Sequence, residues 1–260
     1  MSAPISLTFL GTGTSQGIPV IGSEHPVCLS ADPRDKRLRV SVHLQWHEFS
    51  LVIDCGPDFR QQMLRSEIKH LDAILLTHEH NDHMAGLDDV RPFNFRQKQD
   101  MPLYGCARTL EAIKTRFPYI FLENDKYPGA PGIKTYTISP YNTFELGGKS
   151  ITAIEAKHGS LPILGFKVDN FAYMTDVKTL DDQAKSQLKD LDVLVLSTLR
   201  HEPHSMHLNL DEALELIDEL APKKTYLTHI SHLMGFHAEV SKTLPKGVFL
   251  AHDELKIEIS

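Results

Sequence analysis

Residues 75–90 read LLTHEHNDHMAGLDDV and carry four potential metal ligands within six positions: His78, His80, Asp82 and His83. The apolar run AILLTH that leads into this stretch is typical of a buried strand, so the ligands follow in the loop beyond it. Because alternate residues of an extended chain share a face, His78 and His80 can point to one side. Asp82 and His83 can then close on a second point, and two neighbouring ligand sets indicate two metal ions. Imidazole and carboxylate ligands suit Zn, Mn or Fe(II).

Three later strand-like segments also end on a side chain that can bind metal. They are SITAIEAKH, which ends at His158, FAYMTD, which ends at Asp176, and KTYLTH, which ends at His229. Side chains at strand ends and in the loops beyond them converge on one edge of a sheet, where α/β proteins place their sites. The sequence therefore predicts that four strands bring ligands to one metal centre.

Periodicity and breaker residues predict a chain rich in strands, with fewer helices. We expect strands at residues 5–11, 38–46, 50–56, 73–78, 101–106, 134–139, 150–156, 163–168, 171–176, 192–198, 224–229 and 247–253. We expect helices at residues 58–67, 107–117, 179–190 and 209–220. This order predicts an α/β fold with two sheets packed face to face and helices outside, a four-layer αββα sandwich. No composition break marks a linker, so we expect one domain over residues 1–260.

The composition limits the class of protein. The chain has 260 residues, of which 41% are apolar, so it can bury a sizeable core. Its formal net charge of -7 disfavours nucleic acid as a partner, since the molecule as a whole repels polyanions. The cysteines Cys28, Cys55 and Cys106 show no paired spacing, which favours a reducing compartment. The start lacks a basic signal-peptide region, and no apolar run approaches the ~18 residues of a membrane span. We therefore expect a cytoplasmic protein with no membrane partner.

HEHNDH has the form HxHxDH, and further motifs surround it in the order FLGTGTSQG, LVIDCG, AKHG, TDV and LTHISH. In this combination the chain resembles the metallo-β-lactamase superfamily of dinuclear metallohydrolases over nearly its whole length. The resemblance implies two ligand triads, one for each metal ion: His78, His80 and His158 for the first, and Asp82, His83 and His229 for the second. It also implies that Asp176 bridges the two ions, and that Asp54 orients a ligand from just outside the site.

A centre of two divalent ions can lower the pKa of a water molecule toward neutrality, which suits ester hydrolysis. The segment LGTGTSQGIPVIGSEHPVC resembles a subgroup that contains a pyrroloquinoline-quinone biosynthesis protein and the cyclic phosphodiesterase of phosphonate breakdown, which opens a phosphoribosyl cyclic phosphate. We therefore predict a hydrolase of small or cyclic phosphodiesters that uses Zn or Mn. Asp82 and His207 are the predicted catalytic residues. His207 matches the position of a catalytic histidine in relatives, where it would protonate the departing alkoxide.

That subgroup commonly carries a GCxCxxC cluster that holds a structural zinc ion together with a later histidine. Here the cluster reads Gly22, Ser23, His25 and Cys28, and His232 follows in LTHISH. His25, Cys28 and His232 are thus possible ligands of a third, structural metal, one short of a closed site. The alternative is that Cys28 is buried and the two histidines bond nearby backbone.

Other functions on the same fold stay open. Transfer-RNA 3′-processing endonucleases share the metal motif, but they usually carry a long basic, glycine-rich arm that we do not find in this sequence. Thioester and lactone hydrolases are a further alternative, whereas a binding module without activity is disfavoured because every ligand position is kept. The aromatic residues Phe117, Tyr119, Phe121 and Tyr127 are candidates for a lid over the metals or for the core. The resemblance also suggests a homodimer.

Overall fold

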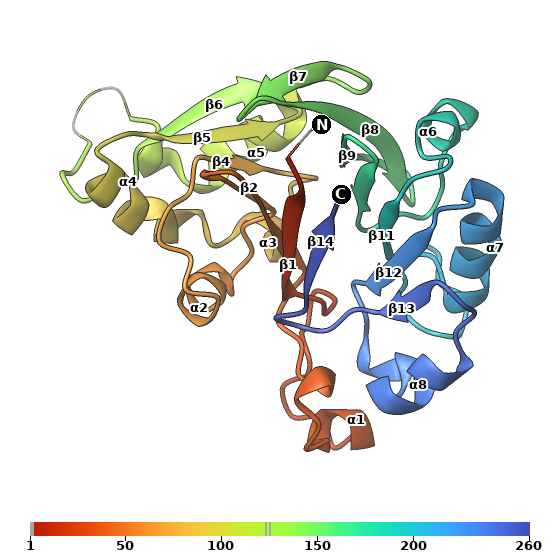
Figure 1. Ribbon diagram of the computed structural model, residues 1–260. Helices are drawn as coiled ribbons and strands as arrows, with labels where there is room; N and C mark the ends of the chain where they lie inside the picture. The colour runs from red at the N-terminus through yellow and green to blue at the C-terminus, as the bar shows by residue number, and fades with distance from the viewer. Residues whose placement is uncertain (1–2, 123, 125) are drawn as a thin grey trace.

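Two seven-stranded β-sheets pack face to face in the computed structural model, which describes residues 3–122, 124 and 126–260 (Figure 1). The first sheet has the strand order β14-β1-β2-β3-β4-β5-β6, and the second has the order β13-β12-β11-β10-β9-β8-β7. The strands of the first sheet are β1 (Ile5–Gly11), β2 (Ser41–Trp46), β3 (Phe49–Ile53), β4 (Ala73–Leu75), β5 (Met101–Gly105), β6 (Ile133–Thr137) and β14 (Lys256–Ile259). Those of the second are β7 (Thr143–Leu146), β8 (Lys149–His158), β9 (Leu161–Val168), β10 (Phe171–Met174), β11 (Val193–Ser197), β12 (Lys224–Thr228) and β13 (Val248–Leu250).

Each sheet is antiparallel in one half and parallel in the other. In the first sheet, β14, β1, β2 and β3 pair antiparallel, and β3 to β6 pair parallel. In the second sheet, β7 to β10 pair antiparallel, and β10 to β13 pair parallel. Because parallel strands have their carboxyl ends at one edge, the loops after β3, β4, β10 and β12 lie together at one edge of the sandwich.

The core lies in three apolar layers, which confirms the predicted four-layer αββα sandwich. Between the sheets, side chains from both inner faces interlock, among them Phe9, Leu44, Phe166 and Tyr173, each with no exposed surface. A second buried cluster lies between the first sheet and its helices, and a third lies between the second sheet and its helices. This packing of alternate strand residues into a shared interior is typical of two stacked sheets.

Eight α-helices belong to the described part of the chain: α1 (Pro26–Leu29), α2 (Phe59–Arg65), α3 (Asn81–Met84), α4 (Arg91–Gln97), α5 (Ala107–Arg116), α6 (Asp182–Gln187), α7 (Leu210–Leu220) and α8 (His237–Thr243). The helix expected at residues 209–220 is α7, and Asn209 and Glu212 form a capping box at its start. The helix expected at residues 179–190 is shorter. It begins after Asp181, whose side chain caps it, because Thr179 pairs with Lys157 as an isolated bridge.

Several helices and strands were not predicted from the sequence. Strands β7 and β14 have four residues each, and helices α4 and α8 have seven each, so none of them repeats its pattern long enough to be recognised. The strand expected from residue 38 begins only at Ser41. Of the candidate lid aromatics, Phe117 and Phe121 pack against the core beneath the first sheet. The Tyr119 hydroxyl donates a hydrogen bond to Asp88, and the Tyr119 ring stacks on Tyr127 at 6.0 Å.

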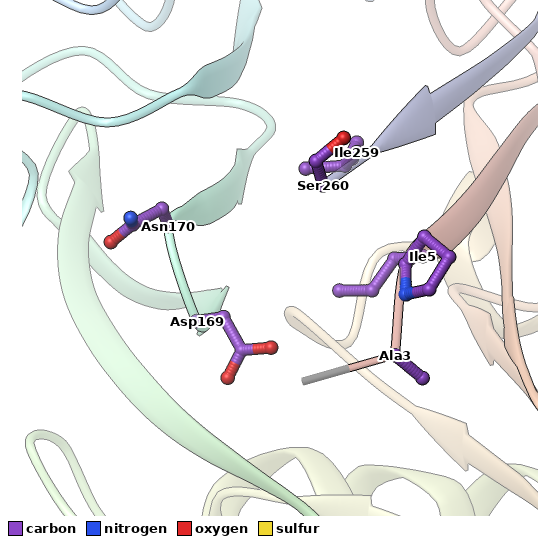
Figure 2. A pocket seen from close by; sticks show the side chains of 7 residues that line it. Ala3, Ile5, Asp169, Asn170, Ile259 and Ser260 are labelled. Atoms are coloured by element: carbon purple, nitrogen blue, oxygen red, sulfur yellow. The ribbon is translucent and has the colours of Figure 1, made fainter. Parts of the chain in front are cut away.

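The two chain ends meet at the edge of the sandwich opposite these loops. A cavity of about 560 Å³ opens there, bordered by Ala3, Ile5, Asn170 and Ile259 (Figure 2). Asn170 immediately precedes β10, whose other end leads to Asp176, so the cavity is separated from the predicted site by the length of that strand. No helix in the described residues is long and apolar enough to cross a membrane.

Candidate metal centre

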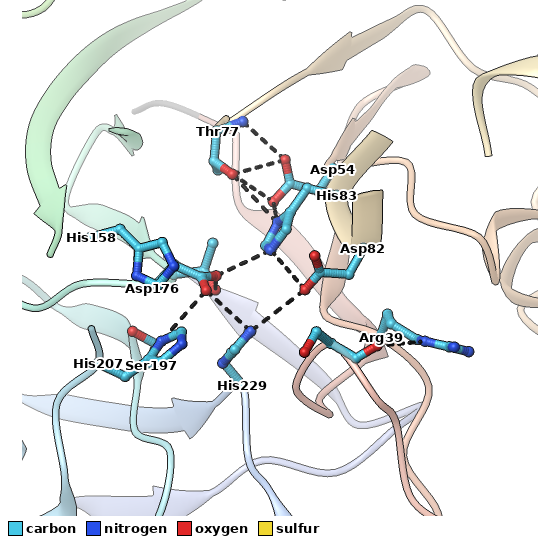
Figure 3. A network of polar contacts seen from close by, with 12 residues as sticks. Arg39, Asp54, Thr77, Asp82, His83, His158, Asp176, Ser197, His207 and His229 are labelled. Atoms are coloured by element: carbon cyan, nitrogen blue, oxygen red, sulfur yellow. Dashed lines mark hydrogen bonds and ion pairs between the residues drawn. The ribbon is translucent and has the colours of Figure 1, made fainter. Parts of the chain in front are cut away.

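The predicted ligands come together where the strands of both sheets end. His78 follows β4, and Asp82 and His83 lie in the short helix α3 just beyond it. From the second sheet, β8 ends at His158, and β12 is followed directly by His229. Figure 3 shows Asp82, His83, His158 and His229 around Asp176, which lies two residues after β10.

Asp176 lies at the middle of the cluster. Its Oδ2 is 3.2 Å from His83 Nε2, and its Oδ1 is 3.2 Å from His229 Nε2. Asp82 Oδ2 is 3.3 Å from His83 Nε2 and 3.9 Å from His229 Nε2. His78, His83, Asp176 and His229 are all at most 2% exposed, so these four side chains are buried, whereas His80 is exposed.

Three groups of potential ligands in the described chain have ligand atoms within 4.8 Å of one another: His78, His83 and Asp176; Asp82, His83 and His229; and His158, Asp176 and His207. The second group equals one of the triads implied by the resemblance. The other implied triad is close but not as tightly grouped. The His80 ring lies 4.6 Å from His78 and 5.2 Å from His158, measured between ring centroids.

The chemistry of this cluster fits divalent metal ions. His78 Nε2, His83 Nε2 and both ring nitrogens of His229 are buried without a hydrogen-bond partner. Buried polar atoms without a partner are costly and demand an explanation. Imidazole nitrogens grouped around carboxylates are ligands for zinc and similar ions, which would satisfy these atoms.

Hydrogen bonds from outside the cluster orient the histidines. Asp54 Oδ2 is 2.7 Å from His83 Nδ1, so the carboxylate accepts the Nδ1 proton and leaves Nε2 free, as the sequence interpretation expected for Asp54. Thr77 was not foreseen. Its hydroxyl lies 2.9 Å from Asp54 Oδ2 and 2.9 Å from His78 Nδ1, so it links the two. The signal was present in the sequence, since Thr77 directly precedes His78. His158 Nδ1 donates to the Met206 carbonyl at 2.8 Å, a backbone contact that no motif reveals.

The backbone is strained at three residues of the site that lie just after strands. Asp54, Asp176 and His229 have φ values of 65°, 56° and 56°, in the left-handed region that residues other than glycine rarely adopt. Such conformations cluster at functional sites, where the surrounding structure holds them. Gly56 supports the same arrangement, because a Cβ at this position would overlap the carbonyl oxygen of Asp82.

Electrostatics within the cluster favour a bound cation. Burial opposes charge on His83, but Asp54, Asp176 and Asp82 outweigh it and raise the pKa of His83 well above its usual value. Burial likewise opposes charge on Asp176, yet His229 and His83 hold the pKa of that carboxyl well below its usual value. The Asp176 carboxylate therefore stays ionised and favours positive charge beside it, which a proton on His83 or a metal ion can supply.

The loop between β11 and α7 carries three histidines that occupy different places. His207 enters the cluster. Its ring lies 4.4 Å from His158 and 4.9 Å from His229, and its Nδ1 is 3.5 Å from Asp176 Oδ1. His204 is farther out, 5.1 Å from the His207 ring, and its Nδ1 accepts the Met206 N–H. His201 faces away and contacts the Met234 carbonyl through Nε2.

The three residues considered for a structural metal are not gathered in the same way. The His25 and His232 rings meet edge to face at 4.9 Å. Cys28 Sγ instead accepts the Val20 N–H at 3.5 Å, and Cys28 packs among apolar residues. Within the described residues these three form no ligand group of the tightness found around Asp176. Cys28 is buried and His25 Nδ1 accepts the Val27 N–H, as in the alternative weighed from the sequence, but His232 Nδ1 is buried without a hydrogen-bond partner, so the third metal stays a prediction.

Residues 50–230 match the family model described as Beta-lactamase superfamily domain. The chain belongs to the beta-lactamase superfamily. The cluster thus lies at the strand ends of a metallo-β-lactamase fold, which implies divalent metal ions.

Two relatives with curated names match this chain over part of their own length. An octanoyltransferase from Porphyromonas gingivalis is 36% identical over 249 residues, which are 95% of this chain and 50% of that protein. A ribonuclease Z from Bradyrhizobium diazoefficiens is 35% identical over 112 residues, which are 42% of this chain and 32% of that protein. The chain therefore spans half or less of the length of these two relatives.

A solved structure covers the chain more completely. The crystal structure of a diphosphatase from the PhnP family has a TM-score of 0.93 and 40% identity, covering 100% of this chain and 98% of that one. Zinc-bound PqqB from Methylobacterium extorquens has a TM-score of 0.79 at 19% identity, covering 97% of this chain and 99% of that one, so it supports the fold alone.

Proposed function

We propose that this chain is a metal-dependent hydrolase that cleaves phosphodiester bonds in a small or cyclic substrate. The observation that carries the proposal is the pair of buried imidazole nitrogens, His83 Nε2 and His229 Nε2, that lie 3.2 Å from the oxygens of Asp176 without a hydrogen bond. The likeness to the diphosphatase of the PhnP family supports a phosphorus centre as the point of attack.

Two divalent ions, zinc or manganese, would be held in this proposal by the seven residues of the cluster: His78, His80, Asp82, His83, His158, Asp176 and His229. Asp176 would contact both, since its two oxygens face different histidines. When bound, such ions supply a nucleophilic water at neutral pH and neutralise charge on the phosphoryl oxygens. Asp54 and Thr77 would keep His83 and His78 in the tautomers that leave their Nε2 atoms available.

His207 would donate a proton to the departing oxygen. Its Nδ1 is buried toward Asp176, whereas its Nε2 has no protein partner in the described chain and keeps contact with solvent. Burial, followed by the charge of His229, lowers the pKa of His207 to about 3, so the free imidazole is neutral. A bound phosphodiester anion favours the protonated form, because an opposite charge nearby raises an imidazole pKa. His207 would thus take up its proton from solvent when the substrate binds.

A diphosphate bond is the second candidate, and the 40% identical diphosphatase favours it. A diphosphate would present a phosphoryl group with negatively charged oxygens to the same ligands. Ribonuclease Z relatives raise a third substrate, transfer RNA, but the net charge of -7 weighs against a polyanion. A homodimer, cytoplasmic location and a single domain stay predictions.

The proposal is tested by hydrolysis of bis-p-nitrophenyl phosphate with purified protein, followed by cyclic phosphates and diphosphates. We expect turnover that is lost in Asp82→Ala, whose carboxylate contacts two histidines of the cluster. Asp182→Ala is the matched control, because Asp182 is exposed in α6, away from the cluster. Equal activity in all three proteins would refute the assignment, since the turnover would then come from a contaminant or another site.

A further inference from the structure

A cleft of about 290 Å³ opens beside the metal centre, between the two sheets. Its walls are the start of α5 after β5, the chain after β6, and the facing strands β8 and β9. Strands β4, β5 and β6 run parallel, so the cleft lies at the same edge of the sheet as His78. Since neighbouring strands are ~4.8 Å apart, the cleft begins within about 5–10 Å of the loop that carries His78.

Direct contacts join the walls of the cleft to the metal-binding loop. Arg108 lines the cleft, and its Nε lies 2.8 Å from Oε1 of Glu79, the residue between His78 and His80. Leu164 also lines the cleft, and its N–H donates to the carbonyl of Thr77 at 3.0 Å. The cleft and the loop are therefore parts of one continuous surface.

The lining is suited to an uncharged ring. Its floor is apolar and buried, formed by Ile138, Ile163 and Leu164. Its polar groups stand at the rim, where Ser139 offers a hydroxyl and Glu155 a carboxylate that can accept hydrogen bonds. Ligand pockets commonly combine such an apolar floor with a few polar groups that fix orientation. Glu155 disfavours an additional anionic group in the cleft, because Arg108 is already paired with Glu79.

We propose that this cleft binds the organic group that remains attached to phosphorus, and that this group is an uncharged, flat ring. The proposal rests on the phosphodiesterase function put forward above. His207 comes from the second sheet, after β11, and would serve the leaving oxygen. The cleft lies on the side of β5 and β6, next to Glu79, and none of its lining residues follows β11, so we assign it to the group that does not depart.

Two substrates with the same leaving group separate this role from catalysis itself. Bis-p-nitrophenyl phosphate keeps a nitrophenyl ring on phosphorus, whereas methyl p-nitrophenyl phosphate keeps only a methyl group. The measured quantity is the ratio of kcat/KM for the first substrate to kcat/KM for the second. Ala107→Phe fills the cleft from the exposed start of α5, and Ser139→Phe fills it from the opposite wall.

We expect each filling variant to lower this ratio of kcat/KM values by about tenfold or more. One methylene group in an apolar pocket already changes kcat/KM by about tenfold or more, and the filled cleft would lose room for a whole ring. Thr115→Phe is the control, since Thr115 is exposed on the same helix ~12 Å farther along and should keep the wild-type ratio. Metal content and thermal unfolding show whether each variant is folded. Folded filling variants with the wild-type ratio would overturn the cleft assignment, whereas a wild-type protein that cleaves neither substrate would overturn the proposed function itself.

Discussion

Replacing Asp54 by asparagine tests whether the cluster is built to hold metal. Asp54 is fully buried, and its Oδ2 accepts the Nδ1 proton of His83 at 2.7 Å. Its Oδ1 accepts the backbone N–H of Thr77 at 2.9 Å, which fixes the side-chain orientation. In Asp54→Asn the amide oxygen can keep the Thr77 contact, but the amide NH₂ then faces His83 Nδ1. His83 would shift its proton to Nε2, the atom that points at Asp176 and Asp82.

That shift should weaken metal binding. Loss of such an outer partner typically costs 10–100-fold in metal affinity, about 1.4–2.7 kcal/mol. The assay is competition between the protein and a chelator for zinc, read by absorbance. Asp72→Asn is the matched control, because Asp72 also contacts a histidine, His70, at 2.8 Å, but at an exposed position. Zinc affinity of Asp54→Asn equal to that of Asp72→Asn would contradict the role of Asp54.

Further predictions concern proton transfer, pH and packing. His207→Gln should lower kcat by about 10²–10⁴-fold while metal content stays at the wild-type value, and loss of metal would show that His207 is a ligand instead. Because neighbouring carboxylates raise the pKa of His83, zinc binding near pH 7 should release about one proton, and affinity should rise with pH; calorimetry in two buffers of different ionisation enthalpy measures this. Burial lowers the pKa of His43 to about 4 in the folded protein. In the unfolded chain this histidine takes up a proton below pH ~6.5, whereas in the folded protein it stays neutral down to about pH 4. Wild-type stability should therefore fall more than that of His43→Gln between pH ~6.5 and ~4, by up to about 3 kcal/mol in urea unfolding. Gly56→Ala should destabilise the fold by about 1–3 kcal/mol and reduce metal content, because the added methyl group displaces the Asp82 carbonyl; unchanged urea unfolding would argue against that close approach.

The strands that carry the site could be predicted because hydrophobic runs ended on ligating side chains. AILLTH, FAYMTD and KTYLTH gave both a buried strand and the residue that follows it, so His78, Asp176 and His229 were expected at one edge. The structure brings them together there. The helix expected at residues 209–220 was found as α7, because its regular pattern is long and Asn209 caps its start.

The remaining features depend on contacts distant in sequence. The backbone carbonyl of Met206 orients His158 although 48 positions separate them, and a carbonyl leaves no mark in the sequence. The structural metal site was suggested by the resemblance to a subgroup with a cysteine cluster, whereas here Cys28 packs among apolar residues and its Sγ accepts the Val20 N–H. The cleft is formed by residues of β6, β8, β9, α5 and the chain after β6, and these residues form no recognisable motif.

The central claim is that the strand-end cluster holds the metal ions that make the chain a phosphodiesterase. Its most direct test is to remove metal with a chelator and add zinc or manganese back in steps, while hydrolysis of bis-p-nitrophenyl phosphate and bound metal are measured on the same samples. The account predicts no turnover without metal and a rise in activity that saturates near about two ions per chain. Turnover by the metal-free protein, or a fully loaded protein without turnover, would contradict it.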